Sequence, residues 1–89
     1  MTLPNFNHAV IVTVMPTIQF PLSTDYIEVN QLLKLVGICD SGGAGKAMVA
    51  QGLVSVDGQA ESRKTAKIRA GQMVACGDLR IDVVADEAD

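Results

Sequence analysis

A chain of 89 residues is long enough for one domain with a modest core, and its 48% hydrophobic content excludes a disordered protein. The formal net charge of −3 argues against a uniformly basic nucleic-acid-binding protein, but the charge is distributed unevenly. Residues 46–69 contain five bases and two acids, for +3, whereas residues 1–45 carry −2 and residues 70–89 carry −4. Because salt screens charges beyond about 8–10 Å, this local excess can still attract a phosphate backbone.

The cysteines and the single histidine do not form a recognisable metal-binding pattern. Cys39 and Cys76 are far apart, and together with His8 they supply too few ligands for zinc. We therefore expect both cysteines to be small apolar residues in a reducing compartment, and we expect no cofactor. No Lys or Arg precedes Lys34, so the apolar run at 9–15 lacks the positive flank of a signal peptide and is too short to span a bilayer. The prediction is a cytoplasmic protein with no membrane partner.

Residues 1–16 are predicted to be an N-terminal extension. Val10–Val14 has strong strand propensity, which is compatible with an extra edge strand or with a loose arm. A third alternative is that the natural start lies at Met15 and that the residues before it are an upstream extension. Thr17–Phe20 then alternates and is followed by Pro21, which predicts a short edge strand.

The next stretch predicts an amphipathic helix. Its apolar residues have the i, i+3, i+4, i+7 spacing of one helical face: Val29, Leu32, Leu33 and Val36. We expect this helix to run from about Glu28 to Val36 and to end at Gly37. Ser, Thr and Asp at positions 23–25 supply possible caps before it.

A second short helix is expected from Ala44 to Gln51, where Gly52 stops it. Either Asp40 or Ser41 can cap its first turn, because both side chains accept hydrogen bonds from backbone N–H groups. This helix follows directly on two glycines, so the turn between the two predicted helices is short.

The second half of the chain reads as strands joined by tight turns. Residues 54–59 predict a hairpin around Asp57-Gly58, because Asp-Gly favours the turn that joins two neighbouring strands. Residues 72–76 and 79–83 predict two further strands, which are joined across Gly77-Asp78. The last residues, 86–89, form an acidic tail that we expect to fray.

The order of these features resembles the RNA-binding domain named after ribosomal protein S-four, and more narrowly its small stand-alone bacterial versions. The shared order is a helix, a Ser-Gly-Gly turn, a helix bearing Lys46, a Val-x-Val-Asp-Gly hairpin, Glu-x-Arg-Lys, and Ala-Gly-Gln before a strand. No single piece is specific, but the ordered combination over residues 17–84 is. The resemblance implies an α+β domain over residues 17–85, the alpha-L RNA-binding motif, with two short helices packed on a small, mainly antiparallel sheet.

Two stretches are candidates for contact with RNA. The first is the start of the second helix, where unpaired N–H groups and a nearby cation suit a phosphate. Its candidate residues are Ser41, Gly42, Gly43 and Lys46. The alternative is that the two glycines merely make a turn between the helices. The second stretch is the basic cluster, whose Arg and Lys side chains suit phosphate contacts: Arg63, Lys64, Lys67 and Arg69. The alternative is that this cluster is an ordinary solvated face.

The resemblance implies that Lys46 and the basic cluster face RNA, although Arg69 adjoins the Ala70-Gly71 turn and can point elsewhere. Many members of the wider family carry basic residues where this chain has Gly42 and Gly43. This departure implies weaker binding and a different RNA target.

Motifs for catalysis are missing from the sequence. A nucleotide-binding P-loop ending at Gly45-Lys46 needs Gly at position 40 and Ser or Thr at 47, but these positions hold Asp and Ala. A nucleophile elbow around Ser41 needs Gly at 39, where Cys stands. The chain also lacks a Ser/His/Asp set, so we expect no enzyme and no small-molecule substrate.

The predicted function is recognition of structured RNA, rRNA or tRNA, through phosphate and shape contacts from a basic face of a ribosome-associated monomer. The alternative is a protein-interaction module in which the N-terminal residues add a strand to a partner. Salt dependence separates the two, because phosphate binding weakens steeply with salt.

Overall fold

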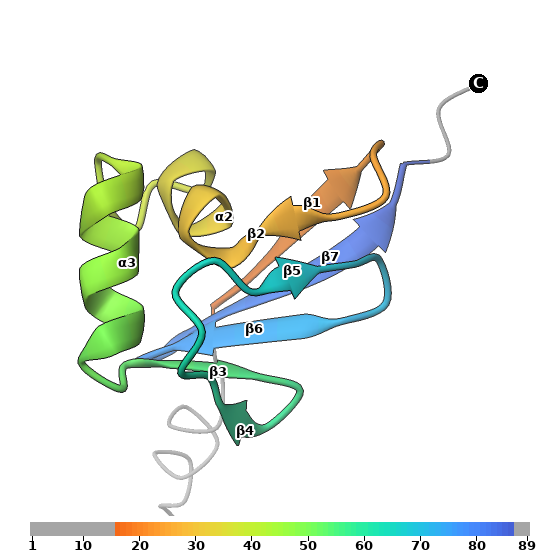
Figure 1. The fold of residues 1–89 in the computed structure, drawn as a ribbon. Helices are drawn as coiled ribbons and strands as arrows, with labels where there is room; N and C mark the ends of the chain where they lie inside the picture. Colours follow the sequence, from red (N-terminus) through yellow and green to blue (C-terminus); the bar gives the residue numbers. More distant parts are fainter. Residues whose placement is uncertain (1–15, 87–89) are drawn as a thin grey trace, which may run out of the picture.

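The computed structural model describes residues 16–86, so the strand-prone Val10–Val14, His8 and the end of the acidic tail lie outside the described residues. Most strands follow the two helices along the chain (Figure 1). The elements are β1 (Thr17–Leu22), β2 (Ile27–Glu28), α2 (Val29–Leu35), α3 (Gly42–Ala50), β3 (Val54–Val56), β4 (Gln59–Ala60), β5 (Lys67–Ile68), β6 (Met73–Cys76) and β7 (Leu79–Ala85).

The strands form one larger sheet and one short ribbon. The larger sheet has the order β1-β7-β6-β3-β4, in which only β1 and β7 run parallel. The ribbon is the antiparallel pair β2 and β5. Figure 1 shows α2 and α3 together at one end of these strands. The predicted architecture, two short helices with a small, mainly antiparallel sheet, is confirmed.

One hydrophobic core joins helices and strands. The predicted helical face is buried, since Val29, Leu32 and Leu33 of α2 are fully enclosed. In the larger sheet, buried residues are paired across neighbouring strands, because Ile81 of β7 lies opposite Val74 of β6 and both are fully buried. Burying a Leu or Ile side chain contributes about 1.5–3 kcal/mol, so this small cluster supplies much of the stability. Its other members are Leu22, Val49, Val54, Ala66, Ile68 and Val83.

The structure corrects the predicted cap of α2 and the predicted beginning of α3. The N-cap of α2 is Glu28, which makes no side-chain cap bond, and residues 23–25 are separated from the helix by Tyr26 and β2. Helix α3 begins at Gly42 rather than at Ala44, because Ser41 is its cap and the next residue is already helical. The C-terminal ends agree with prediction, since Gly37 and Gly52 both have positive φ angles.

Strand β1 runs through Pro21 to Leu22, beyond the predicted end at Phe20. Proline is tolerated there because β1 lies at the edge of the sheet, where a missing N–H leaves no ladder bond unmade. The ribbon of β2 and β5 was not predicted, because each strand has only two residues.

The predicted Asp57-Gly58 turn is confirmed between β3 and β4. Both residues have positive φ angles, 51° for Asp57 and 85° for Gly58, as a type I′ turn requires. The Asp57 carboxylate also accepts a hydrogen bond from the Met73 N–H, at 2.9 Å. The turn is therefore fastened to the start of β6.

We expect Gly58→Val to lower the free energy of unfolding by about 1 kcal/mol or more, because a β-branched residue is strained at this positive φ. Gly58→Asn is the matched control, since Asn tolerates the left-handed region and should cost less. Urea unfolding followed by circular dichroism measures both variants. Equal stability of Gly58→Val and the wild type would contradict the turn geometry.

Helices α2 and α3 approach each other closely at Gly45. A Cβ atom on Gly45 would lie 2.6 Å from the backbone carbonyl oxygen of Asn30 and 3.0 Å from its Cα. Asn30 is itself buried, and its Nδ2 donates to the Gly42 carbonyl at 3.4 Å. This contact fixes where α3 begins relative to α2, and it therefore positions the glycines that precede Lys46.

Candidate nucleic-acid interface

The first candidate region is the beginning of α3. The Ser41 side chain accepts from the Ala44 N–H at 3.0 Å, and the Gly45 N–H donates to the Ser41 carbonyl at 3.1 Å. The N–H groups of Gly42 and Gly43 find no acceptor within residues 16–86. Gly43 is exposed, and a Cβ there would meet only the Ser41 Oγ, at 3.9 Å. At this positive end of the helix, the exposed Gly43 thus carries an N–H group without an acceptor in the described chain, and the half-buried Gly42 carries a second.

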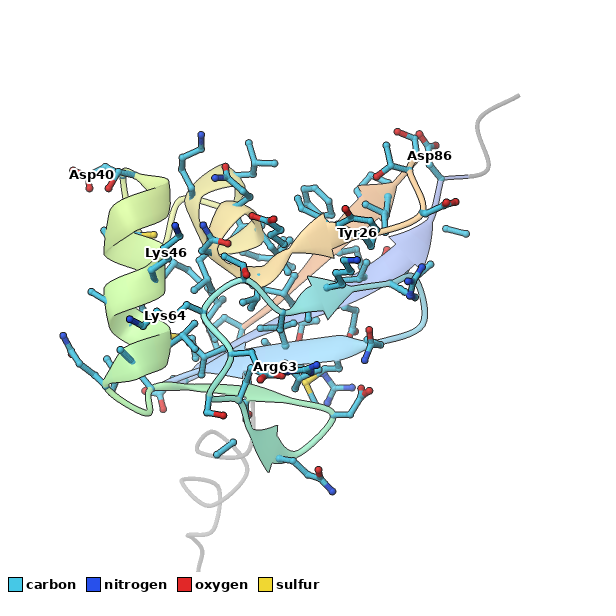
Figure 2. All side chains as sticks on the ribbon, in the orientation of Figure 1. Tyr26, Asp40, Lys46, Arg63, Lys64 and Asp86 are labelled. Atoms are coloured by element: carbon cyan, nitrogen blue, oxygen red, sulfur yellow. The ribbon has the colours of Figure 1, made fainter. Side chains whose placement is uncertain are left out.

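Two charged side chains flank this helix beginning. Lys46 is exposed on α3, and Figure 2 shows it on the same helix whose N-terminal end carries Asp40. The Asp40 carboxylate reduces the positive potential at that end, so it weakens the attraction of the backbone N–H groups for an anion. Lys46 is therefore the side chain on α3 that can supply a net attraction for phosphate.

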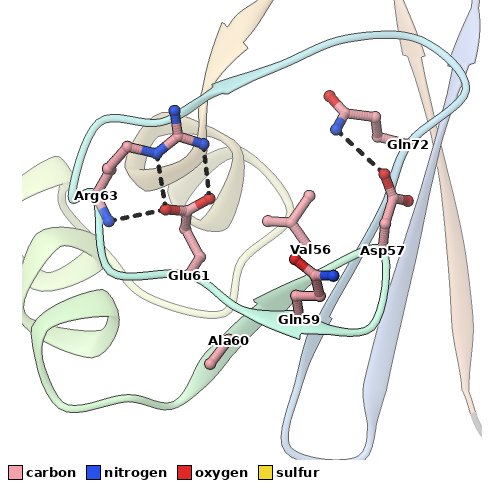
Figure 3. A pocket seen from close by; sticks show the side chains of 7 residues that line it. All are labelled: Val56, Asp57, Gln59, Ala60, Glu61, Arg63 and Gln72. Atoms are coloured by element: carbon pink, nitrogen blue, oxygen red, sulfur yellow. Dashed lines mark hydrogen bonds and ion pairs between the residues drawn. The ribbon is translucent and has the colours of Figure 1, made fainter.

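Arg63 lies in the loop between β4 and β5, and it is paired with an acid. Its Nε and Nη2 donate to the two Glu61 carboxylate oxygens at 3.0 and 3.1 Å, and its backbone N–H donates to Oε2 at 2.8 Å (Figure 3). These bonds lower the pKa of Glu61 and raise that of Arg63. The Arg63 side chain remains 76% exposed, whereas that of Glu61 is 9% exposed. Glu61 thus orients Arg63 and neutralises part of its charge.

One of the two acids between residues 46 and 69 is therefore an ion-pair partner of the basic cluster. The other bases from residue 46 to residue 69 form no ion pair within the described part of the chain: Lys46, Lys64, Lys67 and Arg69.

Three of the predicted bases line one surface groove. It runs along the segment that enters β5 and is lined by Arg63, Thr65, Ala66, Lys67 and Arg69. In β5 the buried Ile68 points into the core, so Lys67 and Arg69 on either side of it point outward together. The groove therefore brings cations from a loop and a strand to one face. We call it the basic groove.

The residue that sequence reasoning missed is Tyr26. The ribbon of β2 and β5 carries it to the two outward cations, with Lys67 Nζ 4.8 Å and Arg69 Cζ 5.7 Å from the ring centroid. The sequence contained no direct signal for this contact, because it depends on pairing between segments about forty residues apart. Tyr26 is exposed, as a surface contact with RNA would require.

A polar pocket beside the hairpin is lined by side chains that hydrogen-bond to one another (Figure 3). The Gln72 Nε2 donates to Asp57 Oδ2 at 3.2 Å, while Gln72 Oε1 accepts from the Arg69 N–H at 2.8 Å. This chain of bonds links the hairpin turn to the backbone of Arg69. It holds the end of the basic groove in place.

The described residues contain neither a cluster of metal ligands nor a membrane-spanning helix. No group of three or more His, Cys, Asp and Glu within residues 16–86 is arranged to hold a metal ion. Neither α2 nor α3, the helices described here, has the length and apolar composition needed to cross a membrane.

Comparison with known proteins identifies the family to which this chain is similar. The profile of the S4 domain, the family named after ribosomal protein S-four, matches residues 20–84. Over 60 residues the chain is 45% identical to YbcJ of Escherichia coli (strain K12), whose descriptive name proposes RNA binding; the match covers 67% of this chain and 86% of that protein. The same figures hold for an uncharacterised protein of the same name in Shigella flexneri.

A solved structure agrees with these matches. The solution structure of E. coli YbcJ has a TM-score of 0.56 and 34% identity to this chain, and it covers 96% of this chain and 99% of its own. That structure is described as having an alpha-L motif involved in RNA binding. The predicted family and fold class are thereby confirmed. The chain belongs to the S4 domain family.

Proposed function

We propose that this protein binds structured RNA, rRNA or tRNA, through phosphate and shape contacts. The basic groove and Lys64 contact the RNA backbone, while Lys46 and the Gly42 and Gly43 N–H groups contact a neighbouring phosphate. A-form RNA presents its backbone and 2′-hydroxyls across a shallow minor groove, so a surface of dispersed donors suits it better than one made for reading base edges.

One observation carries this proposal. In a chain with net charge −3, the structure gathers Arg63, Lys67 and Arg69 along one groove, and Lys67 and Arg69 have no ion-pair partner among residues 16–86. A face formed only for solubility would ordinarily mix both signs of charge. The family supports the same reading, since its relative YbcJ is described as having a motif involved in RNA binding.

The test is the salt dependence of binding by the wild-type protein. Fluorescence anisotropy with a labelled RNA hairpin should give a log–log slope of affinity against salt of roughly −3 or steeper, because each neutralised phosphate releases about 0.7–0.9 counterions. A hairpin DNA of the same sequence is the control, and it should bind more weakly because it lacks 2′-hydroxyls and A-form geometry. Affinity for RNA that is flat in salt would contradict the proposal.

A further inference from the structure

The ribbon of β2 and β5 builds a mixed aromatic and cationic surface at one end of the basic groove. In its register Ile27 pairs with Ile68 and Glu28 with Lys67. Extending the register by one residue places Tyr26 opposite Arg69 and diagonal to Lys67, which is within reach of long side chains. Ile68 takes the core side, so the outer side carries Tyr26 and Arg69, together with Lys67 and its cross-strand neighbour Glu28.

The parts of this surface are held in place by the backbone. Arg69 Nη1 donates to the Asp25 carbonyl at 3.3 Å, next to Tyr26 in the chain, and the Arg69 N–H donates to Gln72 Oε1 at 2.8 Å. The guanidinium therefore stays near the ring even without a ligand. Tyr26 nevertheless keeps 39% of its surface exposed.

Such a surface has a specific chemical use in binding nucleic acid. Every nucleobase has a π face that stacks on an aromatic ring or on a planar guanidinium, and stacking requires a base that is not already inside a duplex. An ammonium group beside the stack suits the phosphate of the same nucleotide. The low aromatic content of the chain disfavours many such sites, but one tyrosine beside two cations is sufficient for one nucleotide.

We propose that Tyr26 and Arg69 form a stacking site for one unpaired nucleotide of the bound RNA, with Lys67 on its phosphate. This inference rests on the proposed function and adds to it: the target is a duplex that carries an unpaired base next to the segment held in the basic groove. The remaining groove residues, Arg63 and Thr65, contact the adjoining paired backbone.

The chain offers a direct probe, because it has one tyrosine and no tryptophan. Its tyrosine fluorescence therefore reports on Tyr26 alone. We would titrate the wild-type protein with a short blunt RNA duplex, and with the same duplex bearing a short unpaired overhang. We expect the overhang to quench the fluorescence and to raise affinity at least about fivefold over the blunt duplex. The blunt duplex should bind without quenching.

Two variants separate stacking from charge. Tyr26→Leu keeps apolar bulk but no ring, so it should lose most of the preference for the overhang, because only Arg69 remains to stack, and it should leave the salt slope unchanged. Tyr26→Phe keeps a ring and should retain the preference for the overhang. Equal wild-type affinities for the two duplexes, or an undiminished preference for the overhang in Tyr26→Leu, would overturn the stacking site and leave the proposed function standing. Failure to bind either duplex would overturn both.

Discussion

Gly45→Ala is expected to lower the free energy of unfolding by about 1–3 kcal/mol, the usual cost of forcing extra atoms into a packed contact. The new methyl group would sit 2.6 Å from the Asn30 carbonyl oxygen, so α2 and α3 must separate. The clash is with backbone, which cannot rotate away as a side chain can. Because small domains have limited stability, this is a large fraction of the total. Urea unfolding followed by circular dichroism measures it.

Gly43→Ala is the matched control in the same helix turn. Its methyl group would meet only the Ser41 Oγ, at 3.9 Å, and Ala has the higher helix propensity. We therefore expect stability unchanged or raised by up to about 1 kcal/mol. If both alanine variants were equally stable, the close approach of the two helices at Gly45 would be wrong.

The second large effect is on RNA binding. Replacing Lys46, Arg63, Lys64 and Lys67 together by Ala should flatten the log–log salt slope by about 3, because each lost phosphate contact removes roughly 0.7–0.9. All four residues are exposed, so the fold should remain intact, as circular dichroism can verify. A quadruple variant with wild-type affinity and slope would show that the basic cluster is only a solvated face.

Single variants refine this result. Lys64→Ala removes a cation without an ion pair in the described chain, whereas Arg80→Ala removes one that is paired with Asp82 on β7, outside the basic groove. Both variants change the net charge by one. We expect the slope to flatten for Lys64→Ala and to stay unchanged for Arg80→Ala, measured by the same anisotropy titration. Equal effects would indicate long-range charge rather than local contact.

A negative charge at residue 43 tests whether a phosphate binds at the beginning of α3. Gly43→Asp places a carboxylate where a phosphate would bind, although an acid in the first turn favours the helix itself. We therefore expect a folded protein with binding abolished while all the bases remain. Gly43→Asn has nearly the same size without the charge and should bind far better. If Asp and Asn bind alike, no phosphate lies at this end of α3.

The sequence by itself determined the helices, the hairpin and most of the candidate residues. Val29, Leu32 and Leu33 have helical spacing, and Asp57-Gly58 has the composition of a tight turn, so both features depend on neighbours in the chain. The positions of Lys46 and of the basic cluster followed in the same way, from residue type and order. The boundaries at Gly42 and Leu22 were missed because a cap bond and an edge position extend those elements.

Only the tertiary structure decided which of these residues act together. Tyr26 contacts Lys67 and Arg69 because β2 pairs with β5. A strand of two residues is too short for an alternating sequence pattern, so this pairing could not be predicted from the sequence. The sequence does not indicate why residue 45 is a glycine, and only the packing of α2 against α3 shows that a side chain there would clash with Asn30. Glu61 and Arg63 are close in sequence, but only the loop conformation makes their bidentate pairing possible. Contacts across the fold depend on geometry that local spacing does not encode, and the surface proposed to bind RNA is made of such contacts.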